Sequence, residues 1–411
     1  MNFDVIVVGA GPAGATAAKV LGEAGIVTLL LDKSAFPRDK PCGGGISARV
    51  MQRFPYLSGA LAGIPVNWVS KIYFESPAGF AVDYESPNPL YLMIRRYEFD
   101  NLLFAMARPR VEFQAQALVR KVTIDSDGMT LSADVAGEPR EFRSKALLGC
   151  DGANSVVARA RGLRTGSARD EYAIDMMEET PYEELSLPVR DRMYVYYGFQ
   201  GLFGYGYVFP KAKHINLGVG CKLDQYLAEF RGGHYSHHES FVEKRISDGL
   251  ITGSSNRDNF QAFPLPISGP LRQTYSDRVL LCGDAGGFVN AFTAEGIFYA
   301  MVTGELAAKA AIEAVRAQDF SQAGLSRYER AWKKEIGMDL EKSVKIQRLL
   351  REDISRVDRL VKEAMRNWPL ADLLARYATG ALDYSHFKRS VVRRALPLYI
   401  QERVLALFDR R

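Results

Sequence analysis

Hydrophobic residues near the start of the chain fall into two short runs with a helical pattern between them. The first run covers residues 5–8 and the second covers residues 26–31. Runs this short, bounded by turn residues, are typical of buried strands. The pattern therefore predicts a strand, a tight turn, a helix and a second strand, which together form a βαβ unit.

The turn after the first strand carries glycines at G-x-G-x-x-G spacing, Gly9, Gly11 and Gly14, and the second strand ends at Asp32. In such a unit the first glycine permits the turn, the second lets a pyrophosphate approach the backbone, and the third brings helix and strand together. The helix start offers unpaired N–H groups to phosphates, and the acid can accept hydrogen bonds from a ribose. The stretch predicts a dinucleotide site.

The rest of the chain alternates between α/β and β-rich patterns. Antiparallel strands are predicted within residues 69–92 and in a Tyr- and Phe-rich section, residues 171–263. Further strands are predicted at 111–122, 129–135, 146–150 and 277–282, with helices at 94–108, 156–161 and 298–315. From residue 325 onward the pattern is helical, with breaks at Pro369, Gly380 and Pro397.

This alternation predicts an α/β protein in which two domains are woven from one chain. We assign residues 1–65, 93–165 and 268–320 to a Rossmann-like nucleotide-binding domain. Residues 66–92 and 166–267 are assigned to an antiparallel β-rich substrate domain, and 321–411 to a helical C-terminal region. A ligand cleft is expected between two such domains.

The composition is that of a globular protein with a basic tail. The 411 residues are 47% hydrophobic and 25% charged, no run approaches the ~18 apolar residues of a spanning helix, and no signal-like segment precedes the first strand. We therefore expect a cytoplasmic protein with no nucleic-acid partner.

The basic residues are concentrated in the tail. From residue 341 onward the net charge is +7, whereas the whole chain carries +5. The tail is expected either to contact a membrane surface peripherally or to present a solvated helix face. Its most basic stretch contains Lys388, Arg389, Arg393 and Arg394, before apolar residues 396–400.

Cysteine and histidine positions favour neither disulfides nor a metal. The four cysteines, Cys42, Cys150, Cys221 and Cys282, are scattered, and no C-x-x-C pair occurs. His234, His237 and His238 are predicted to lie in a Gly/Ser-rich loop without a partner ligand, so we expect no metal.

A second unusual loop follows Asp32. Pro37, Pro41 and three consecutive glycines at 43–45 exclude regular structure there. Consecutive glycines cost backbone entropy, so they suit a place where the main chain passes close to something flat or bulky, although a plain linker is the alternative. Cys42 beside them is either a small buried residue or a thiol placed against a cofactor.

A second glycine-bearing helix start lies near Gly283-Asp284 and Gly296-Ile297. Two such starts suit a flavin dinucleotide, which carries a pyrophosphate and a ring that becomes anionic on reduction. No second G-x-G-x-x-G is present for a nicotinamide nucleotide. We therefore predict FAD, with electrons from NAD(P)H or from a ferredoxin-like donor.

These motifs together carry a family resemblance over about residues 1–315. The glycine turn, Arg96-x-x-Phe99-Asp100, Asp151-Gly152 and Gly283-Asp284 resemble the FAD domain of the p-hydroxybenzoate hydroxylase superfamily. Within it, Pro41-Cys42-Gly43-Gly44-Gly45 and Tyr205-x-Tyr207-x-Phe209-Pro210, followed by Gly218-x-Gly220, resemble the geranylgeranyl reductase family. That family usually has Trp where this chain has Tyr207.

The resemblance implies roles for individual residues. FAD would be held by the glycine turn and by Ala13, Asp32, Arg96, Asp284, Gly296 and Ile297, with Cys42, Gly43 and Gly45 beside the isoalloxazine. Tyr205, Tyr207, Phe209 and Pro210 would line a cavity for substrate, and Gly218 and Gly220 would keep its wall thin. The alternative for these aromatics is an ordinary sheet core, because aromatic residues are common on strands.

The family chemistry is saturation of isoprenoid C=C bonds on a polyprenyl diphosphate, glycerolipid or quinone. Reduced flavin N5 would supply hydride, and an acid would supply a proton. We take Cys42, or a water held by it or by Tyr207, as the acid, with a packing role for Cys42 equally open. Two other functions are considered: monooxygenation or halogenation of an aromatic substrate, and flavin-bound lipid binding without turnover.

Overall fold

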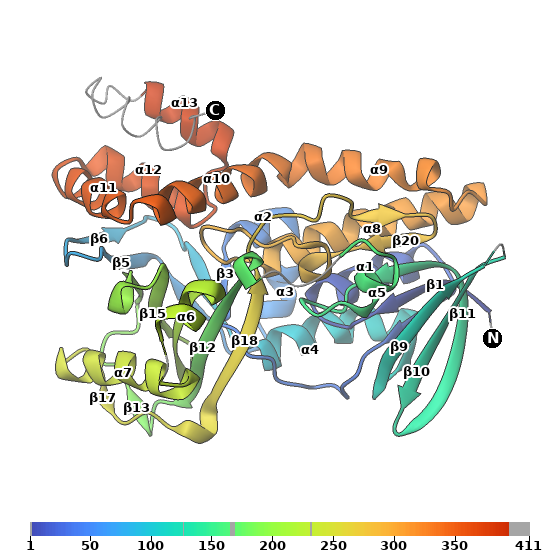
Figure 1. Cartoon of the computed structure of the whole chain (residues 1–411), viewed down its shortest axis with the longest axis horizontal. Coiled ribbons are helices and arrows are strands. Elements are labelled where there is room, and N and C mark those ends of the chain that lie inside the picture. Colours follow the sequence, from blue (N-terminus) through green and yellow to red (C-terminus); the bar gives the residue numbers. More distant parts are fainter. Residues whose placement is uncertain (1, 126, 165–168, 231, 394–411) are drawn as a thin grey trace. The chain divides into compact units, whose positions relative to one another are not determined.

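The computed structural model describes residues 2–125, 127–164, 169–230 and 232–393, and it has the predicted mixed α/β fold (Figure 1). The chain divides into two compact units, each assembled from three segments. Unit 1 contains Met1–Lys40, Arg96–Ala168 and Pro266–Glu341. Unit 2 contains Pro41–Arg95, Arg169–Leu265 and Lys342–Arg411.

Unit 1 is built on an eight-stranded sheet. Its main strand order is β19-β20-β11-β1-β2-β8. Strand β10 also pairs with β11, and β9 pairs with β10. Strands β20, β11, β1, β2 and β8 run parallel. The bounds are β1 (Asn2–Val8), β2 (Thr28–Leu31), β8 (Glu112–Gln114), β9 (Ala117–Ile124), β10 (Met129–Val135), β11 (Glu138–Gly149), β19 (Tyr275–Ser276) and β20 (Val279–Leu281).

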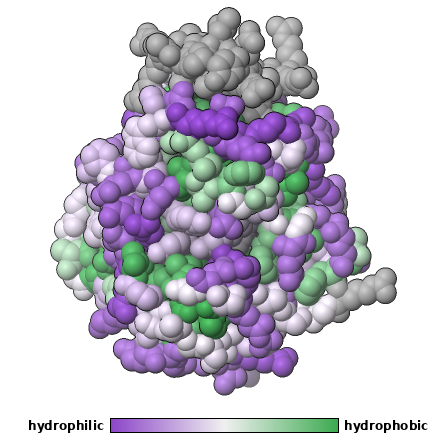
Figure 2. Space-filling view, turned by 90° about the vertical axis from the view of Figure 1, so that its left-hand side faces the viewer, coloured by the Kyte–Doolittle hydropathy of each residue, from purple (hydrophilic) through white to green (hydrophobic). Residues whose placement is uncertain are grey.

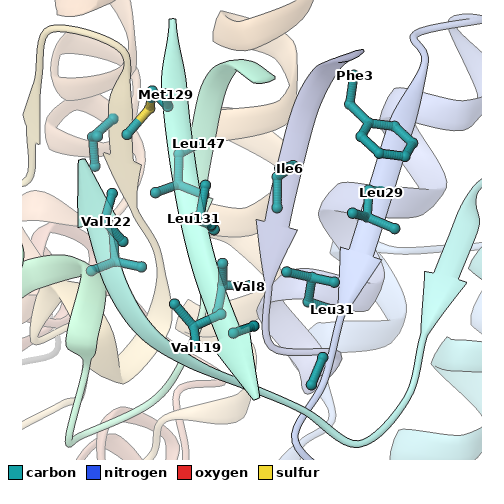
Figure 3. Close-up of a cluster of buried hydrophobic side chains, with 14 of the residues drawn as sticks. Phe3, Ile6, Val8, Leu29, Leu31, Val119, Val122, Met129, Leu131 and Leu147 are labelled. Atoms are coloured by element: carbon teal, nitrogen blue, oxygen red, sulfur yellow. The ribbon is translucent and has the colours of Figure 1, made fainter. Parts of the chain in front are cut away.

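Alternate residues of these strands form one hydrophobic core (Figure 3). Ile6 and Val8 of β1 lie beside Leu29 and Leu31 of β2, and Leu131 of the hairpin closes the cluster. Residues two apart on a strand point to the same face, so each strand contributes side chains in this alternating pattern. The core explains why the first two apolar runs become adjacent parallel strands.

The helices of unit 1 are α1 (Pro12–Glu23), α4 (Arg96–Ala107), α5 (Val156–Ala160), α8 (Ile297–Ala317) and α9 (Gln322–Trp332). Helices α1 and α8 cross closely, because a Cβ atom added to Gly304 would lie only 2.2 Å from the carbonyl oxygen of Ala13. Helix α9 belongs to this unit through two hydrogen bonds. Tyr328 Oη donates to Leu281 O at 2.6 Å, and Trp332 Nε1 donates to Thr274 Oγ1 at 3.1 Å.

Unit 2 is built on a seven-stranded sheet with the order β18-β12-β16-β15-β14-β5-β6. The β12, β16, β15 and β14 neighbours pair antiparallel, as does β5 with β6, whereas β14 and β5 are parallel. The bounds are β5 (Lys71–Glu75), β6 (Ala81–Glu85), β12 (Tyr172–Pro181), β14 (Arg192–Tyr197), β15 (Gly204–Pro210), β16 (His214–Lys222) and β18 (Phe260–Pro266). Smaller sheets join β3 (Gly45–Ser47), β7 (Tyr91–Met93) and β4 (Asn67–Val69), and β13 (Leu185–Ser186) with β17 (Thr252–Gly253).

The helices of unit 2 include four, within residues 49–61 and 223–247, that the sequence analysis missed. The helices of this unit are α2 (Arg49–Arg53), α3 (Leu57–Leu61), α6 (Leu223–Glu229), α7 (His234–Ser247), α11 (Ser355–Arg366), α12 (Trp368–Ala378) and α13 (Tyr384–Arg393), and α10 (Met338–Glu352) spans the boundary between the units. The predicted loop at the histidines was wrong, because they begin α7. His237, His238, Phe241, Val242 and Arg245 form its buried face at helical spacing.

The unit boundaries differ from those we predicted. Residues 41–65 were assigned to the nucleotide domain, but β3 pairs antiparallel with β7 and so belongs to unit 2. Most of the C-terminal region also belongs to unit 2. Tyr84 Oη donates to Asp372 Oδ1 at 2.7 Å, and the N–H of Ala78 donates to Asp358 Oδ1 at 2.9 Å.

Two of the predicted breaks in the C-terminal helices lie at helix boundaries, whereas the break between α10 and α11 was not predicted. Pro369 lies in the first turn of α12, whose N-cap is Asn367, and Gly380 follows this helix with a φ of +68°. Arg394, Pro397 and residues 396–400 lie outside the described residues. Within the described ranges no helix is long and apolar enough to cross a membrane.

Some hydrophobic side chains lie on the surface. On the face drawn in Figure 2, they form separate patches among hydrophilic residues. Two large apolar side chains near the junction of α11 and α12, Met365 and Trp368, are more than half exposed, at 56% and 57%.

Candidate functional site

The first glycine turn of unit 1 contains glycines of two kinds. A Cβ atom on Gly9, whose φ is +97°, would lie 2.3 Å from Cys150 O, and one on Gly14 would lie 1.7 Å from Gly9 O. These two positions are therefore closed by the protein's own backbone. Gly11 is the N-cap of α1, and a Cβ atom there would meet only Arg38 Nη2, at 3.5 Å. The space in front of Gly11 is thus available for a ligand's approach to the helix start.

Asp32 is fixed beside this turn at the end of β2. Its Oδ2 accepts a hydrogen bond from the N–H of Ala10 at 2.7 Å, and its Oδ1 accepts one from the N–H of Ser34 at 2.8 Å. The residue is only 7% exposed. Because each carboxylate oxygen can accept a further hydrogen bond, the held side chain suits a ribose hydroxyl.

Two arginines of unit 1 share one buried acid. Arg96 makes a bidentate pair with Asp100, with both N···O distances at 2.7 Å, and Arg38 Nη1 lies 3.0 Å from Asp100 Oδ2. Burial by itself would raise the pKa of Asp100, but the charges of Arg96 and Arg38 lower it below its usual value. Arg96 is thus oriented by Asp100, whereas Arg38 lies at the glycine turn and is a cation that the sequence analysis did not select.

The structure places the residues of the second predicted helix start, Asp284 and Gly296, beside each other. Strand β20 leads to Gly283, whose φ is +56° and whose N–H donates to Thr303 Oγ1 at 3.0 Å. A Cβ atom on Gly296 would lie 3.4 Å from Asp284 Oδ1, so this carboxylate lies beside the N-cap of α8, just before Ile297. Lys40 Nζ approaches Asp284 Oδ2 at 3.9 Å.

Arg164 connects two turns of this site and was also missed. Its buried guanidinium donates to Ala153 O at 3.0 Å and, through Nη2, to Asp284 O at 3.0 Å and Ala285 O at 3.3 Å. Asp151 caps α5, where its Oδ2 accepts from the N–H of Val156 at 2.7 Å. These contacts hold the Asp151 turn against the Asp284 turn, and no local sequence pattern signals them.

In unit 2 the glycine loop packs against the predicted aromatic face. A Cβ atom on Gly43 would lie 3.1 Å from the Phe209 ring and 3.2 Å from the Tyr207 ring, and one on Gly45 would lie 3.3 Å from Phe209. The N–H of Gly44 donates to Cys42 Sγ at 3.4 Å. The glycines therefore let the main chain lie directly on two aromatic rings.

The three aromatic residues of β15 share one face of the sheet. Ring centroids are 6.2 Å apart for Tyr205 and Tyr207 and 4.5 Å apart for Tyr207 and Phe209. Tyr207 is buried, whereas Tyr205 and Phe209 are half-buried. Pro210, which the resemblance implies as a cavity residue, lies on the other face of β15, because successive strand residues alternate and its partner Ile215 lies in the core beneath α7.

The two glycines of β16 have different surroundings. Gly218 is opposite Tyr207 and Gly220 is opposite Tyr205. A Cβ atom on Gly218 would lie 2.2 Å from Tyr207 Cζ, whereas one on Gly220 would meet nothing closer than 3.9 Å. Gly218 is therefore covered by the tyrosine ring and makes room for it.

The ring of Tyr207 reaches a buried acid across β16. Tyr207 Oη donates to Asp175 of β12, with both carboxylate oxygens at 3.3 Å. Burial raises the pKa of Tyr207 well above its usual value, and the charge of Asp175 adds to this. Tyr207 keeps its proton and is a poor acid. Asp175 was not selected from the sequence because 32 residues separate it from Tyr207.

The cysteines are all free, and only Cys42 is not buried. Burial raises the pKa of Cys221 to about 12, and a hydrogen bond with Cys282 together with burial raises that of Cys150. Within the ranges that the structure describes, no group of three or more His, Cys, Asp or Glu residues could hold a metal ion.

Comparison with known proteins identifies the family of the chain. The chain matches the FAD binding domain family over residues 2–333. It is 30% identical over 372 residues to digeranylgeranylglycerophospholipid reductase 1 of Methanopyrus kandleri, covering 86% of this chain and 92% of that protein. It is 28% identical to reductase 2 of the same organism, covering 86% and 87%.

Solved structures share the fold. A geranylgeranyl bacteriochlorophyll reductase-like protein from Thermoplasma acidophilum aligns with a TM-score of 0.81 at 20% identity, covering 99% of each chain. A flavin-dependent brominase aligns with a TM-score of 0.73 at 20% identity, covering 98% of this chain and 100% of that one. At these identities the alignments show the fold alone.

The fold and the two helix starts define an FAD-dependent oxidoreductase. The chain belongs to the FAD-binding-domain family and, within it, to the geranylgeranyl reductases. The predicted family, enzyme class and cofactor are thereby confirmed. The residues also fit FAD chemically, because unit 1 offers two helix starts, an acid for a ribose and a cation at the glycine turn.

Proposed function

We propose that this enzyme saturates C=C bonds of geranylgeranyl or polyprenyl chains, with a prenylated glycerophospholipid as the first substrate to test. The observation that carries the proposal is the packing of the Cys42–Gly45 loop on the face of Tyr207 and Phe209. The half-buried rings of Tyr205 and Phe209 on this face would offer apolar surface to an isoprenoid, and the loop brings a thiol beside them. The reductases of Methanopyrus kandleri named above support the choice of lipid.

We further propose that FAD is held by residues of unit 1. Gly11 and Ala13 at the start of α1 would receive the pyrophosphate with Arg38, and Asp32 would receive the ribose. The flavin end of the cofactor would be contacted by Asp284, Gly296 and Ile297. Arg96, which is oriented by Asp100, would also contact FAD, as the family resemblance implies. That Cys42, Gly43 and Gly45 contact the flavin stays a prediction from the family resemblance.

In the proposed reaction, bound FAD supplies a hydride equivalent after reduction, and residues of unit 2 supply the rest. The alkene gains hydride at one carbon and a proton at the other, so an acid must give up a proton beside the aromatic face. Tyr207 is unsuited, because its hydroxyl is committed to Asp175 and its pKa is raised. Cys42, with its sulfur oriented by the Gly44 N–H, or a water that it holds, remains the proposed donor.

Product analysis tests the reaction. Holoenzyme reduced with dithionite is incubated without oxygen with digeranylgeranylglyceryl phospholipid, and the lipid is analysed by mass spectrometry. The proposal predicts lipid that has gained two hydrogen atoms for each saturated bond. Unchanged lipid, together with O₂-dependent hydroxylation or halogenation of an aromatic substrate, would instead support the monooxygenase or halogenase alternative. FAD retention without either reaction would support the binding-protein alternative.

Substitution of the thiol tests the proton donor. Cys42→Ala should lower the rate of reduced-flavin oxidation by prenyl lipid at least 10-fold, because a general acid typically contributes about 10²–10⁴-fold. Cys221→Ala is the control, because this thiol is buried and unreactive. Near-normal turnover by Cys42→Ala would show that another group donates the proton.

We also propose peripheral membrane contact through the C-terminal helices. An exposed Trp and Met beside basic residues suit the interface of an anionic membrane, and Trp368 and Met365 lie next to Arg366 in sequence. Co-sedimentation with anionic vesicles should be stronger than with neutral ones and should fall for the Met365→Ser/Trp368→Ser double variant. Trp68→Ser is the control, because Trp68 is also exposed, at 43%, but lies on β4. Equal sedimentation of all variants would reject this surface.

A further inference from the structure

A buried lysine holds the glycine loop of unit 2. Lys211 directly follows β15, and only 2% of the residue is exposed. Its Nζ donates hydrogen bonds to Gly43 O and, at 3.0 Å, to Ile94 O. Burying an ammonium group is costly unless its N–H groups find acceptors, and these two carbonyls are acceptors for it.

Three successive carbonyls of the loop accept hydrogen bonds from three different partners. Asn216 Nδ2 donates to Cys42 O at 3.4 Å, Lys211 Nζ donates to Gly43 O, and the N–H of Ile94 donates to Gly44 O at 3.0 Å. Gly45 then enters β3. The backbone from Cys42 to Gly44 is thus fixed, and Lys211 supplies the charged member of this set.

Gly44 shows how closely the lysine and the loop are matched. Its φ is +59°, and a Cβ atom there would lie 2.3 Å from Lys211 Nζ and 2.2 Å from Ile94 O. A side chain at Gly44 would displace the ammonium group from the loop. The middle glycine is therefore required by the lysine's position as well as by the backbone conformation.

We propose that Lys211 is a positioning residue that fixes the Cys42–Gly45 loop, and with it the Cys42 thiol, against the aromatic face of β15. Loss of its N–H donors would leave Gly43 O and Ile94 O without this partner and would release the loop. The consequence for turnover rests on the proposed function, whereas the effect on the loop does not.

The thiols themselves report on the loop. Cys42 is half-buried and the other three cysteines are buried, so alkylation of the holoenzyme by iodoacetamide, followed by peptide mass spectrometry, measures the four sites separately. In Lys211→Met, the rate at Cys42 should rise at least 10-fold while the three buried sites stay slow. Lys213→Met is the matched control, because Lys213 is exposed in the turn that follows, and its Cys42 rate should equal the wild-type rate.

A second variant distinguishes release of the loop from general misfolding of the protein. Lys211→Gln keeps amide N–H donors without the charge and should give a Cys42 rate between those of wild type and Lys211→Met. An unchanged Cys42 rate in both variants would overturn the proposal. A joint rise at all four cysteines in both would also overturn it, because Lys211 would then support unit 2 as a whole.

Kinetics extend the test to the reaction. With flavin content equal to wild type, Lys211→Met should lower kcat for prenyl-lipid reduction at least 10-fold and leave KM within about 2-fold, as expected for a misplaced proton donor. Failure of the proposed function would appear as no prenyl reduction by the wild-type enzyme. The alkylation result would be unaffected by that failure, so the two inferences are tested separately.

Discussion

The glycines of the two units are packed against different kinds of neighbouring atoms. In unit 1, Gly9 and Gly14 are closed in by backbone oxygens, which would lie 2.3 and 1.7 Å from an added Cβ atom. In unit 2, Gly43 and Gly218 are closed in by the rings of Phe209 and Tyr207, at 3.1 and 2.2 Å. The first region is a backbone cradle built mainly from one βαβ unit. The second depends on aromatic side chains of one strand, β15, which contact Gly218 of the neighbouring strand and Gly43 far away in the sequence.

The largest expected effect separates the glycines within the backbone cradle. Gly14→Ala should abolish folding of unit 1, because the new methyl group would overlap Gly9 O. Gly11→Ala should fold with an apo melting temperature close to wild type, yet bind FAD at least 10-fold more weakly, because only the ligand needs that space. Thermal melts of apo-protein and FAD titration check both. If Gly11→Ala binds FAD normally, the pyrophosphate does not lie against Gly11.

A second pair of glycine variants, Gly218→Ala and Gly220→Ala, tests the packing of the aromatic rings in unit 2. Gly218→Ala should displace the Tyr207 ring and destabilise the protein by about 1–3 kcal/mol, the usual cost of overpacking. Gly220→Ala should cost much less, since its new Cβ atom would make only ordinary contacts at 3.9 Å. Urea unfolding of both variants provides the comparison. Equal destabilisation would mean that the ring of Tyr207 does not lie over Gly218.

Acid should destabilise unit 2 through a histidine that the reaction does not use. His237 is buried among Phe199, Tyr226 and Phe230, and burial lowers its pKa from 6.5 to about 4. Because the unfolded chain binds this proton first, stability is full above pH 6.5 and is lost as pH falls toward 4. Between about pH 7 and pH 5 the loss should be about 2 kcal/mol.

His237→Phe should remove that part of the pH dependence. Urea midpoints at the same two pH values measure the change, and His386→Phe is the control, because His386 is exposed on α13. A variant that loses as much stability between these pH values as wild type would contradict the assignment to His237.

The smallest expected effect concerns the cation at the glycine turn. Arg38→Met should weaken FAD binding about 10-fold, equivalent to about 1.4 kcal/mol, because a partly buried charge beside the pyrophosphate is lost. Arg120→Met is the control, since Arg120 is exposed on β9 and pairs with Asp134 at 3.5 Å. FAD titration that gives equal affinities for both variants would exclude Arg38 from the pyrophosphate site.

The difference between local and long-range contacts explains which features could be predicted from the sequence. The βαβ unit, Asp32 and the helix start at Gly296 follow local rules of spacing, and the structure brings them together as expected. Lys211 and Asn216 hold a loop from which 168 and 174 residues separate them, so no local pattern signals their role. The error at α7 has another cause: its polar composition suggested a loop, whereas the burial of every third or fourth residue makes it a helix.

We have proposed that reduced flavin in this protein passes its electrons to an isoprenoid double bond. The direct measurement is anaerobic: the bound FAD is photoreduced, mixed with prenylated phospholipid, and followed by its absorbance. We predict that oxidised flavin returns with the unsaturated lipid and not with the fully saturated lipid. A flavin that stays reduced with both lipids, and is oxidised only when O₂ is admitted, would contradict the account.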